Sequence, residues 1–446
     1  SSVASEITGP PRNGNDSHMS GDGKMGLWAV VAIGVGGMVG GGIFAVLGLA
    51  VQLAHGGTPV AFALAGMVAL LTAYSYAKLS VAYPGRGGTV SFLDRTFGAG
   101  MLTGSLNVLL WLSYVVMLSL YAFAFGSYGS TFLPVAWQLA GKHALISLVV
   151  ITIAGINLLN AELIGKAEIW IVAIKLAILL LFVGAGLSGI HASQIAPGSW
   201  SPPLQLAAGG MIIFLAYEGF ELIANTANDV RDVARTLPRA YYTAVGFVIA
   251  LYVLVSLVTV GNLPVDKIVA AKDYALAEAA RPFLGQTGFA LIAIAAMLST
   301  ASAINATLYG AARLSYCIAR DGELPVMLER KVWGQPVEGL LITAGLTLFV
   351  ANVFDLTSIA TLGSAGFLLI FAAVNTANAR HAPHTHSRGW ISAAGAVACL
   401  VALAALIWQT AMTGPAKLWI LAVMLALAVL IEGAYRLTKR EISLHV

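Results

Sequence analysis

The stretch Val35-Gly36-Gly37-Met38-Val39-Gly40-Gly41-Gly42-Ile43-Phe44 places glycine at five of ten positions, inside an apolar run from Leu27 to about Leu53. A helix of this length crosses roughly 30 Å of hydrocarbon, but this many glycines predict an interruption. Backbone groups left unpaired in a bilayer cost several kcal/mol each unless they line a cavity. At a break, one half-helix offers carbonyls and the next offers N–H groups. The stretch therefore predicts a site for a small zwitterion; close helix packing through Gly-x-x-x-Gly is the alternative.

The composition of the whole chain indicates a polytopic membrane protein. Of its 446 residues, 59% are hydrophobic and 10% are charged, and the mean hydropathy is +0.86, whereas about a quarter of an ordinary soluble protein is charged. The net charge of +4 does not indicate nucleic acid, because in membrane proteins the placement of Lys and Arg matters more than their total. Two cysteines, Cys317 and Cys399, are too few for a disulfide framework or a thiolate metal site. Residues 1–23 are expected to be a disordered cytoplasmic tail.

Twelve apolar runs are predicted to be transmembrane helices. They lie near residues 27–54, 59–81, 99–127, 144–159, 167–189, 206–226, 239–262, 287–319, 338–353, 356–378, 391–411 and 416–437. With a cytoplasmic N-terminus, eighteen of the 24 Lys and Arg residues fall on the cytoplasmic side, five fall on the far side, and Lys175 lies inside a helix. This asymmetry follows the positive-inside rule and predicts that both termini are cytoplasmic.

A second interruption is predicted in the sixth helix. There Phe214-Leu215-Ala216-Tyr217-Glu218-Gly219-Phe220-Glu221 places two carboxylates and a glycine at mid-span. Helices 1 and 6 run in opposite directions because five crossings separate the two breaks, so helices 1–5 and 6–10 can be inverted repeats. Broken helices at matching positions of two repeats point to the binding site of a transporter. The alternative for Glu218 and Glu221 is structural pairing with another helix.

Lys175 is a further ionisable residue at mid-membrane depth, because apolar residues flank it on both sides in the fifth predicted helix. Burial disfavours the charged form of an amine, so Lys175 is a candidate to release and regain a proton during a transport cycle. Its expected polar partners in the eighth helix are Ser299, Thr300, Ser302 and Asn305. The alternative is a permanently charged lysine that holds helices 1, 5 and 8 together.

Four stretches carry a resemblance to a known family: Gly40–Phe44; Tyr83-Pro84-Gly85-Arg86-Gly87-Gly88; Phe214–Glu221 with Arg235-Thr236-Leu237-Pro238-Arg239-Ala240 after it; and Ala319-Arg320-Asp321-Gly322-Glu323-Leu324-Pro325. The chain resembles the amino acid, polyamine and organocation superfamily over roughly residues 25–437. The resemblance implies an all-α polytopic fold of about twelve helices, with a LeuT-like 5+5 inverted repeat in which helices 1 and 6 are broken. Residues 24–380 would form the transporter core, and residues 381–446 would form helices 11 and 12 and a cytoplasmic C-terminus.

The resemblance also implies the substrate site. In similar permeases the backbone of the first break holds the substrate carboxylate, which maps onto Gly40, Gly41, Gly42 and Ile43. Carbonyls that flank both breaks hold the ammonium, and the matching residues are Val35, Phe214, Leu215 and Ala216. Glu218 departs from the family pattern, and two readings stay open for it: attraction of a cationic group, or service as a second proton carrier.

Coupling and gating residues follow from the same resemblance. Lys175 matches the fifth-helix lysine that, in proton-coupled members, stands where sodium-coupled relatives bind an ion, and Ser299 and Ser302 are its expected neighbours. Glu221 falls where related antiporters place a gating carboxylate. The aromatic residues expected to shape the pocket and close over it are Tyr114, Tyr217 and Phe220, with lipid-facing or packing roles as the alternative.

These expectations describe a secondary transporter of the cytoplasmic membrane that imports an amino acid or a related amine, with protons as the coupling ion and no cofactor or metal. A polyamine or cationic amino acid exchanger is the alternative, because Glu218 and Glu221 would supply anionic partners. An ion channel is less expected because each glycine-rich break occurs once. An enzyme is not expected, since the apolar runs contain no Gly-x-Ser-x-Gly or His-Glu-x-x-His. The segment His381–His386 is expected to be a solvated loop rather than a metal site.

Overall fold

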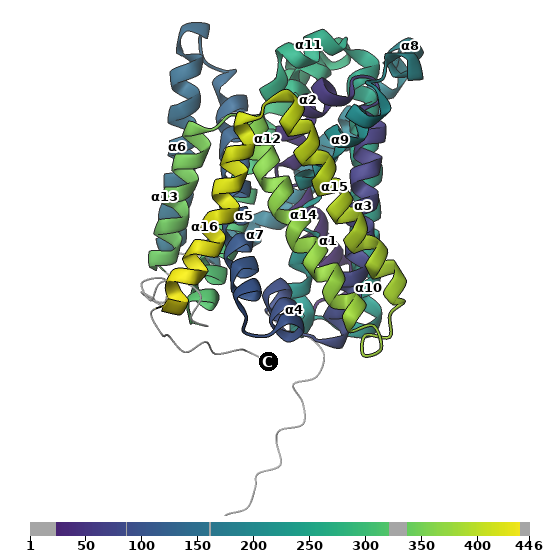
Figure 1. Ribbon diagram of the computed structural model, residues 1–446. Coiled ribbons are helices and arrows are strands. Elements are labelled where there is room, and N and C mark those ends of the chain that lie inside the picture. The colour runs from purple at the N-terminus through teal and green to yellow at the C-terminus, as the bar shows by residue number, and fades with distance from the viewer. Residues whose placement is uncertain (1–23, 86, 160–161, 321–336, 438–446) are drawn as a thin grey trace, which may run out of the picture.

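The computed structural model describes residues 24–85, 87–159, 162–320 and 337–437, which form a bundle of tilted helices (Figure 1). The α-helices are α1 (Leu27–Met38), α2 (Gly42–Ala54), α3 (Thr58–Ala82), α4 (Gly88–Phe97), α5 (Met101–Ser130), α6 (Gln138–Leu159), α7 (Glu162–Gly186), α8 (Ala192–Ile195), α9 (Pro203–Ile212), α10 (Val233–Asn262), α11 (Val265–Ala270), α12 (Ala275–Arg320), α13 (Val337–Val353), α14 (Leu356–Arg380), α15 (Gly389–Thr413) and α16 (Ala416–Leu437). The 3-10 helices are η1 (Val135–Trp137), η2 (Leu187–Gly189), η3 (Pro197–Ser199), η4 (Phe214–Tyr217), η5 (Phe220–Asp229) and η6 (Lys272–Tyr274).

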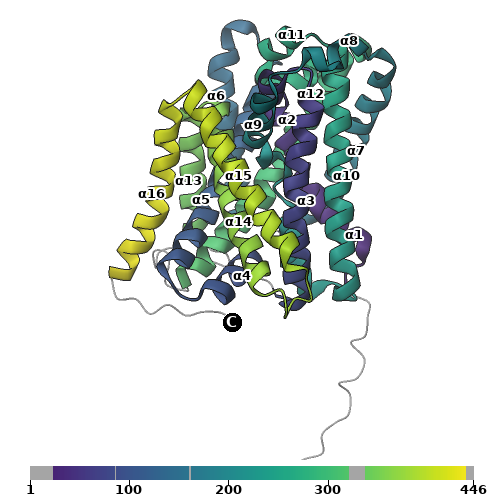
Figure 2. The same cartoon turned by 45° about the vertical axis from the view of Figure 1, so that its right-hand side comes forward.

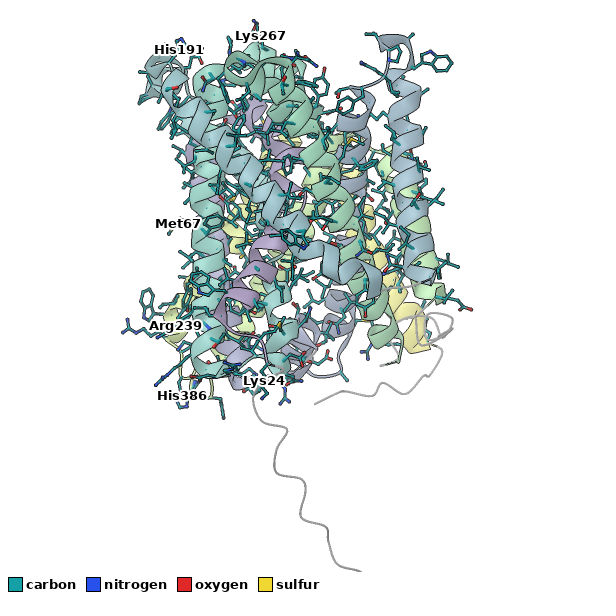
Figure 3. All side chains as sticks on the ribbon, turned by 180° about the vertical axis from the view of Figure 1, so that it is seen from behind. Lys24, Met67, His191, Arg239, Lys267 and His386 are labelled. Atoms are coloured by element: carbon teal, nitrogen blue, oxygen red, sulfur yellow. The ribbon has the colours of Figure 1, made fainter. Side chains whose placement is uncertain are left out.

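The number of spans agrees with the predicted polytopic fold. Within the described ranges, nine helices are long and apolar enough to cross a membrane, and two bent pairs raise this to as many as eleven. The shorter apolar helix α13 accounts for the remaining predicted run. The bundle has two ends, which we name by residues labelled in Figure 3: Lys24, Arg239 and His386 mark the Lys24 end, and His191 and Lys267 mark the Lys267 end.

The two predicted interruptions are confirmed. Helices α1 and α2 meet at 47°, and α9 meets the η4 and η5 segment at 50°. In the first break α1 ends at Met38 and α2 begins at Gly42. In the second break Gly219 separates η4 from η5 and has φ +121°, a conformation that glycine adopts far more readily than other residues.

The two breaks pack against each other, backbone to backbone. A Cβ atom added to Gly219 would lie 2.4 Å from the carbonyl carbon of Gly37, and one added to Gly42 would lie 2.8 Å from Cα of Ala216. Such approaches leave no room for a side chain at either position. Glycine therefore serves two purposes here: it lets the helices break, and it lets the broken segments touch.

The remaining helices form a frame around this contact. Helix α10 packs along α3 and α1, and α14 packs on α3, α5 and α15. Figure 2 shows α16 at the edge of the bundle, on the opposite side from α1 and α10. Among the described spans, α5 and α14 are the most completely buried, so they form the centre of the frame.

One segment differs from its predicted form. The sequence predicted that the eighth helix starts at about residue 287. In the structure α12 already begins at Ala275 and turns at Gly285, where φ is +63°. The glycine conformation allows the chain to change direction there, so the helix begins before the predicted apolar run and bends at this glycine.

Candidate functional site

A cavity of about 620 Å³ lies between the breaks and the Lys24 end of the bundle. Its wall at the breaks includes Gly37, Glu218 and Gly219, and it extends to Met25 and Tyr309. Most of the remaining wall is apolar and comes from Ala29, Ala32, Ile33, Ile169, Val172, Leu222, Ala303 and Ala306. The cavity therefore joins the meeting point of the two breaks to one end of the molecule.

Glu218 is the one charged residue among the described residues that line this cavity. It lies between η4 and η5, and its side chain is 3% exposed. Its carboxylate accepts a hydrogen bond of 3.4 Å from the hydroxyl of Tyr121, which comes from α5. The second break thus places a carboxylate against a mostly apolar space, whose lining also includes Asn157, Asn305 and Thr307.

Glu221 lies beside Glu218 but makes different contacts. Its Oε1 accepts a hydrogen bond of 3.2 Å from the Tyr114 hydroxyl, and its Oε2 accepts one of 2.8 Å from the N–H of Gly219. Tyr114 and Glu221 line a smaller cavity of about 70 Å³. The structure therefore brings together Tyr114 and Glu221, two of the three predicted gating residues.

Side chains from α7 and α12 hold the carbonyls of the first break. Lys175 is 1% exposed, and its Nζ donates to the carbonyl of Gly36 over 3.1 Å. The Ser299 hydroxyl lies 3.0 Å from the carbonyl of Val39 and also contacts that of Gly40. Ser302 is buried about one turn further along α12. The lysine and the predicted serines are thus on the two helices that flank the first break.

Most of the carbonyls predicted to receive the ammonium already have donors. Val35 O accepts from the N–H of Val39 at 2.9 Å, and Leu215 O accepts from the N–H of Glu218 at 3.1 Å. Ala216 O lies 3.1 Å from the hydroxyl of Tyr252. The side chain of the fourth predicted residue, Phe214, packs on Phe371 with ring centroids 5.9 Å apart.

Tyr252 of α10 connects the two breaks. Besides its contact with Ala216, its hydroxyl lies 2.7 Å from the carbonyl of Met38 in the first break. It is fully buried, so water does not compete for these contacts. Nothing in the sequence distinguishes this residue from the other tyrosines of the long helix α10, Tyr241 and Tyr242.

The backbone that is predicted to hold the substrate carboxylate lies against Tyr121. In the described part of the chain, the N–H groups of Gly41, Gly42 and Ile43 at the start of α2 make no hydrogen bond. A Cβ atom on Gly41 would lie 2.4 Å from Cδ1 of Tyr121, so the tyrosine ring covers this helix start. Gly40, by contrast, donates its N–H to Gly37 O at 3.2 Å.

Two predicted aromatic residues lie away from the cavity. The Tyr217 hydroxyl donates to Phe62 O at 2.7 Å, and Phe220 packs on Tyr76 and Phe371 with ring centroids 5.6 and 5.3 Å apart. Neither residue is part of the described cavity lining. In this structure both therefore have packing roles, the alternative noted from the sequence.

Sequence reasoning missed Tyr121, although a signal for it exists. Tyr114, Tyr121 and Tyr128 follow one another at intervals of seven residues in α5, which places them on one face of a helix. Their hydroxyls donate to Glu221, to Glu218 and, at 2.8 Å, to the carbonyl of Phe44. We call these three residues the α5 tyrosine row. The row faces both breaks along their length.

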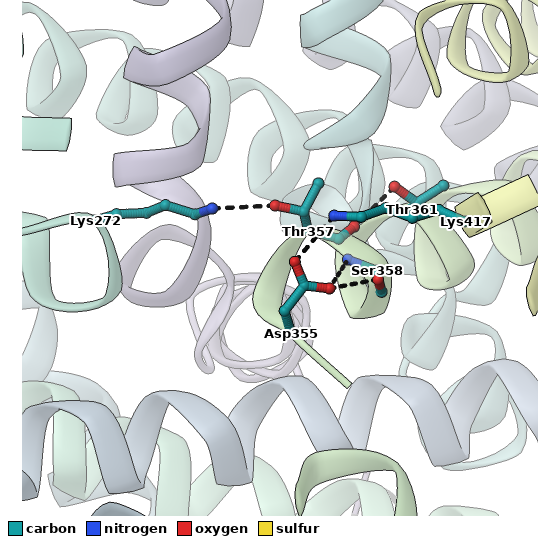
Figure 4. Close-up of polar contacts among 6 residues, drawn as sticks. All are labelled: Lys272, Asp355, Thr357, Ser358, Thr361 and Lys417. Atoms are coloured by element: carbon teal, nitrogen blue, oxygen red, sulfur yellow. Dashed lines mark hydrogen bonds and ion pairs between the residues drawn. The ribbon is translucent and has the colours of Figure 1, made fainter. Parts of the chain in front are cut away.

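A polar cluster lies toward the Lys267 end (Figure 4). Lys272 of η6 donates to Thr357 at 3.1 Å, and Asp355 pairs with Lys417 at 2.9 Å. Burial raises the pKa of Asp355, but hydrogen bonds from Ser358 and Lys417 outweigh burial and hold this pKa below its ordinary value. The backbone of Lys272 also packs so closely on α2 that a Cβ atom at Gly48 would lie 2.2 Å from its carbonyl oxygen. The hydrogen bond from Lys272 to Thr357 thus joins η6 to α14, while the backbone of η6 packs on α2.

Metal ligands do not gather within the described ranges, which contain no group of three or more His, Cys, Asp or Glu residues able to hold a metal ion. His381 and His384 lie with ring centroids 6.2 Å apart, just beyond the end of α14. The pKa of His381 is lowered by its partial burial and by the nearby His384 and Arg95.

Comparison with known proteins gives a consistent family. Residues 25–430 match the amino acid permease family. An uncharacterised protein of Methanocaldococcus jannaschii is 39% identical over 352 residues, which are 78% of this chain and 80% of that protein. The inner membrane transport protein YbaT of Escherichia coli is 34% identical, with 91% and 95% of the two chains covered. A methylthioribose transporter of Bacillus subtilis is 27% identical, with 77% and 78% covered.

Proposed function

Because the chain belongs to the amino acid permease family, we propose that it is a secondary active transporter that imports an amino acid or a related amine by alternating access. The observation that carries this proposal is the cavity of about 620 Å³ that starts where the two breaks meet and extends toward the Lys24 end. Polar groups on unwound backbone at such a point are what a transporter needs to hold a small charged solute. One relative is named for methylthioribose, so family membership alone does not name the substrate.

The described conformation fits an inward-facing state in this proposal. The distribution of basic residues favours a cytoplasmic Lys24 end by the positive-inside rule, and the cavity extends toward that end. At the Lys267 end, η6 rests on α2 beside the polar cluster. The outward-facing state would then require η6 and α2 to separate. The Escherichia coli relative is named an inner membrane protein, which favours the same membrane here.

We assign proton coupling to Lys175. Its Nζ donates to Gly36 O at 3.1 Å, and hydrogen bonds from charged donors are worth about 1.5 to 3 kcal/mol, more than those from neutral donors. Loss of the lysine proton would weaken this contact and loosen α1 from α7. Each 1.4 kcal/mol changes a conformational equilibrium about tenfold, so one proton is enough to bias the position of α1.

The test is uptake into proteoliposomes with an inward proton gradient and no sodium. The parent protein should concentrate its substrate, and Lys175→Ala should lose this response while substrate exchange without a gradient continues. Lys24→Ala, at an exposed lysine outside the helices, is the matched control and should behave like the parent. If Lys175→Ala still concentrates substrate, the coupling assignment is wrong. If no amino acid or amine enters with or without a gradient, the transport proposal itself fails.

Exchange of polyamines is the second candidate, and the geometry favours it less. A polyamine carries several positive charges along its length, whereas the described cavity wall offers one anionic group, the carboxylate of Glu218. Both oxygens of Glu221 already accept hydrogen bonds from Tyr114 and Gly219. Spermidine should therefore compete poorly with a monoamine in the same uptake assay.

A further inference from the structure

Building on the proposed transport function, we infer that this chain binds the ammonium group of its substrate through the Glu218 carboxylate rather than through backbone carbonyls, and that the substrate carries an apolar body. The inference names the substrate class of the cavity described above: a monoamine or an amino acid with an apolar side chain. It rests on three observations, which concern the carbonyls, the carboxylate and the cavity wall.

Several carbonyls at the breaks already accept hydrogen bonds from buried side chains of the protein. The carbonyl of Gly36 accepts a hydrogen bond from Lys175, and the carbonyl of Val39 accepts one from Ser299. Met38 O and Ala216 O share Tyr252. A carbonyl oxygen can accept two hydrogen bonds, so each of these carbonyls has about half of its acceptor capacity left for an ammonium ion. The carbonyls therefore offer a substrate less than they would in an open break.

Glu218 offers what the carbonyls do not. Its carboxylate lines the cavity, and its hydrogen bond from Tyr121 is long, at 3.4 Å. It also interacts with Glu221, both through charge and through a hydrogen bond between the two side chains. A hydrogen bond between two carboxyl groups needs a proton between them, and a cation beside the pair favours the charged form of both groups in place of that proton. An ammonium group on Glu218 supplies this cation.

The wall of the cavity determines the rest of the ligand. Beyond Glu218, the wall runs along Ile33, Val172 and Leu222, and an apolar ligand body gains free energy by leaving water for such a surface. The N–H groups that would hold a substrate carboxylate lie behind the ring of Tyr121. The amine should therefore contribute more to binding in this state than the carboxylate.

The experiment compares four small probes on the purified full-length protein by thermal stabilisation and by competition. Leucine carries both groups, isoamylamine is leucine without its carboxylate, isocaproate is leucine without its amino group, and methylamine has no apolar body. We expect leucine and isoamylamine to bind, and isocaproate and methylamine to bind at least about tenfold more weakly. Stronger binding of isocaproate than of isoamylamine would overturn the inference without any mutation.

Variants locate the effect. Glu218→Gln should lower the affinities for leucine and isoamylamine by about ten- to a hundredfold, the range expected for loss of a hydrogen bond to a charged group. Glu432→Gln is the matched control, because Glu432 is also a fully buried carboxylate but lies on α16 and pairs with Arg436. It should leave both affinities unchanged. Equal affinities in Glu218→Gln and the parent would overturn the inference.

The outcome separates this inference from the transport proposal. If proteoliposomes concentrate a charged or strongly polar amino acid while the protein binds neither leucine nor isoamylamine, the inference fails and the transport proposal stands. If no amino acid or amine is transported, both fail. If leucine is transported and depends on Glu218 as described, both are supported.

Discussion

Replacement of Gly219 by alanine tests whether the contact between the two breaks organises the molecule. Gly219 has φ +121°, and an added Cβ atom would lie 2.4 Å from the carbonyl carbon of Gly37 and 2.6 Å from the nitrogen of Met38. A side chain at such a backbone angle costs about 1 to 3 kcal/mol, and forcing packed backbones apart costs about 1 to 3 kcal/mol more. We therefore expect Gly219→Ala to lose about 2 to 6 kcal/mol of stability.

The assay is thermal unfolding of the purified protein in detergent, together with uptake into proteoliposomes. Gly184→Ala is the matched control, because Gly184 lies within α7 and an added Cβ atom would have no neighbour within 4 Å. Alanine is the better helix former by about 1 kcal/mol, so this control should be neutral or slightly stabilised. Gly219→Ala should unfold at a clearly lower temperature and should transport poorly.

The refuting result is specific. If Gly219→Ala unfolds at the temperature of the parent protein and retains full uptake, the backbone contact with Gly37 organises neither the fold nor the substrate site. If stability falls but uptake per folded molecule is normal, the contact supports the fold and does not shape the substrate site. We expect Gly219→Ala to lower both the unfolding temperature and the uptake per folded molecule.

Two further predictions concern single side chains. Tyr252→Phe removes the hydroxyl that contacts Met38 O at 2.7 Å and Ala216 O at 3.1 Å, so the free energy of unfolding should fall by about 1 to 3 kcal/mol; an unchanged unfolding temperature would mean that other donors replace the hydroxyl. Asp355 has a lowered pKa beside Lys417, so its contribution to stability is present above its unfolded pKa and is lost as the pH falls through its folded pKa. Below a pH of about 4 the parent protein should lose stability more steeply than Asp355→Asn, and parallel pH curves would contradict this.

The sequence carried the information that depends on local chemistry. Glycine in Gly40–Gly42 and at Gly219 predicted the interruptions, because the backbone freedom of glycine is a property of the residue itself. Lys175 and Glu218 stood out because an ionisable group at mid-membrane depth is costly wherever it points. The family motifs and the distribution of basic residues completed this picture, which extends to the polytopic fold.

The tertiary structure decided which groups face which. Tyr121 and Tyr217 both lie in strongly apolar surroundings, yet Tyr121 reaches Glu218 in the cavity and Tyr217 turns away to Phe62. The Tyr252 hydroxyl contacts the carbonyl of Met38, 214 residues away in the chain, and so joins helix α10 to the first break. A helix buried on all sides has no polar face from which the direction of one side chain can be read. The packing of neighbouring helices determines where a buried side chain points and which carbonyls accept its hydrogen bonds. Both properties are therefore decided only when the chain folds.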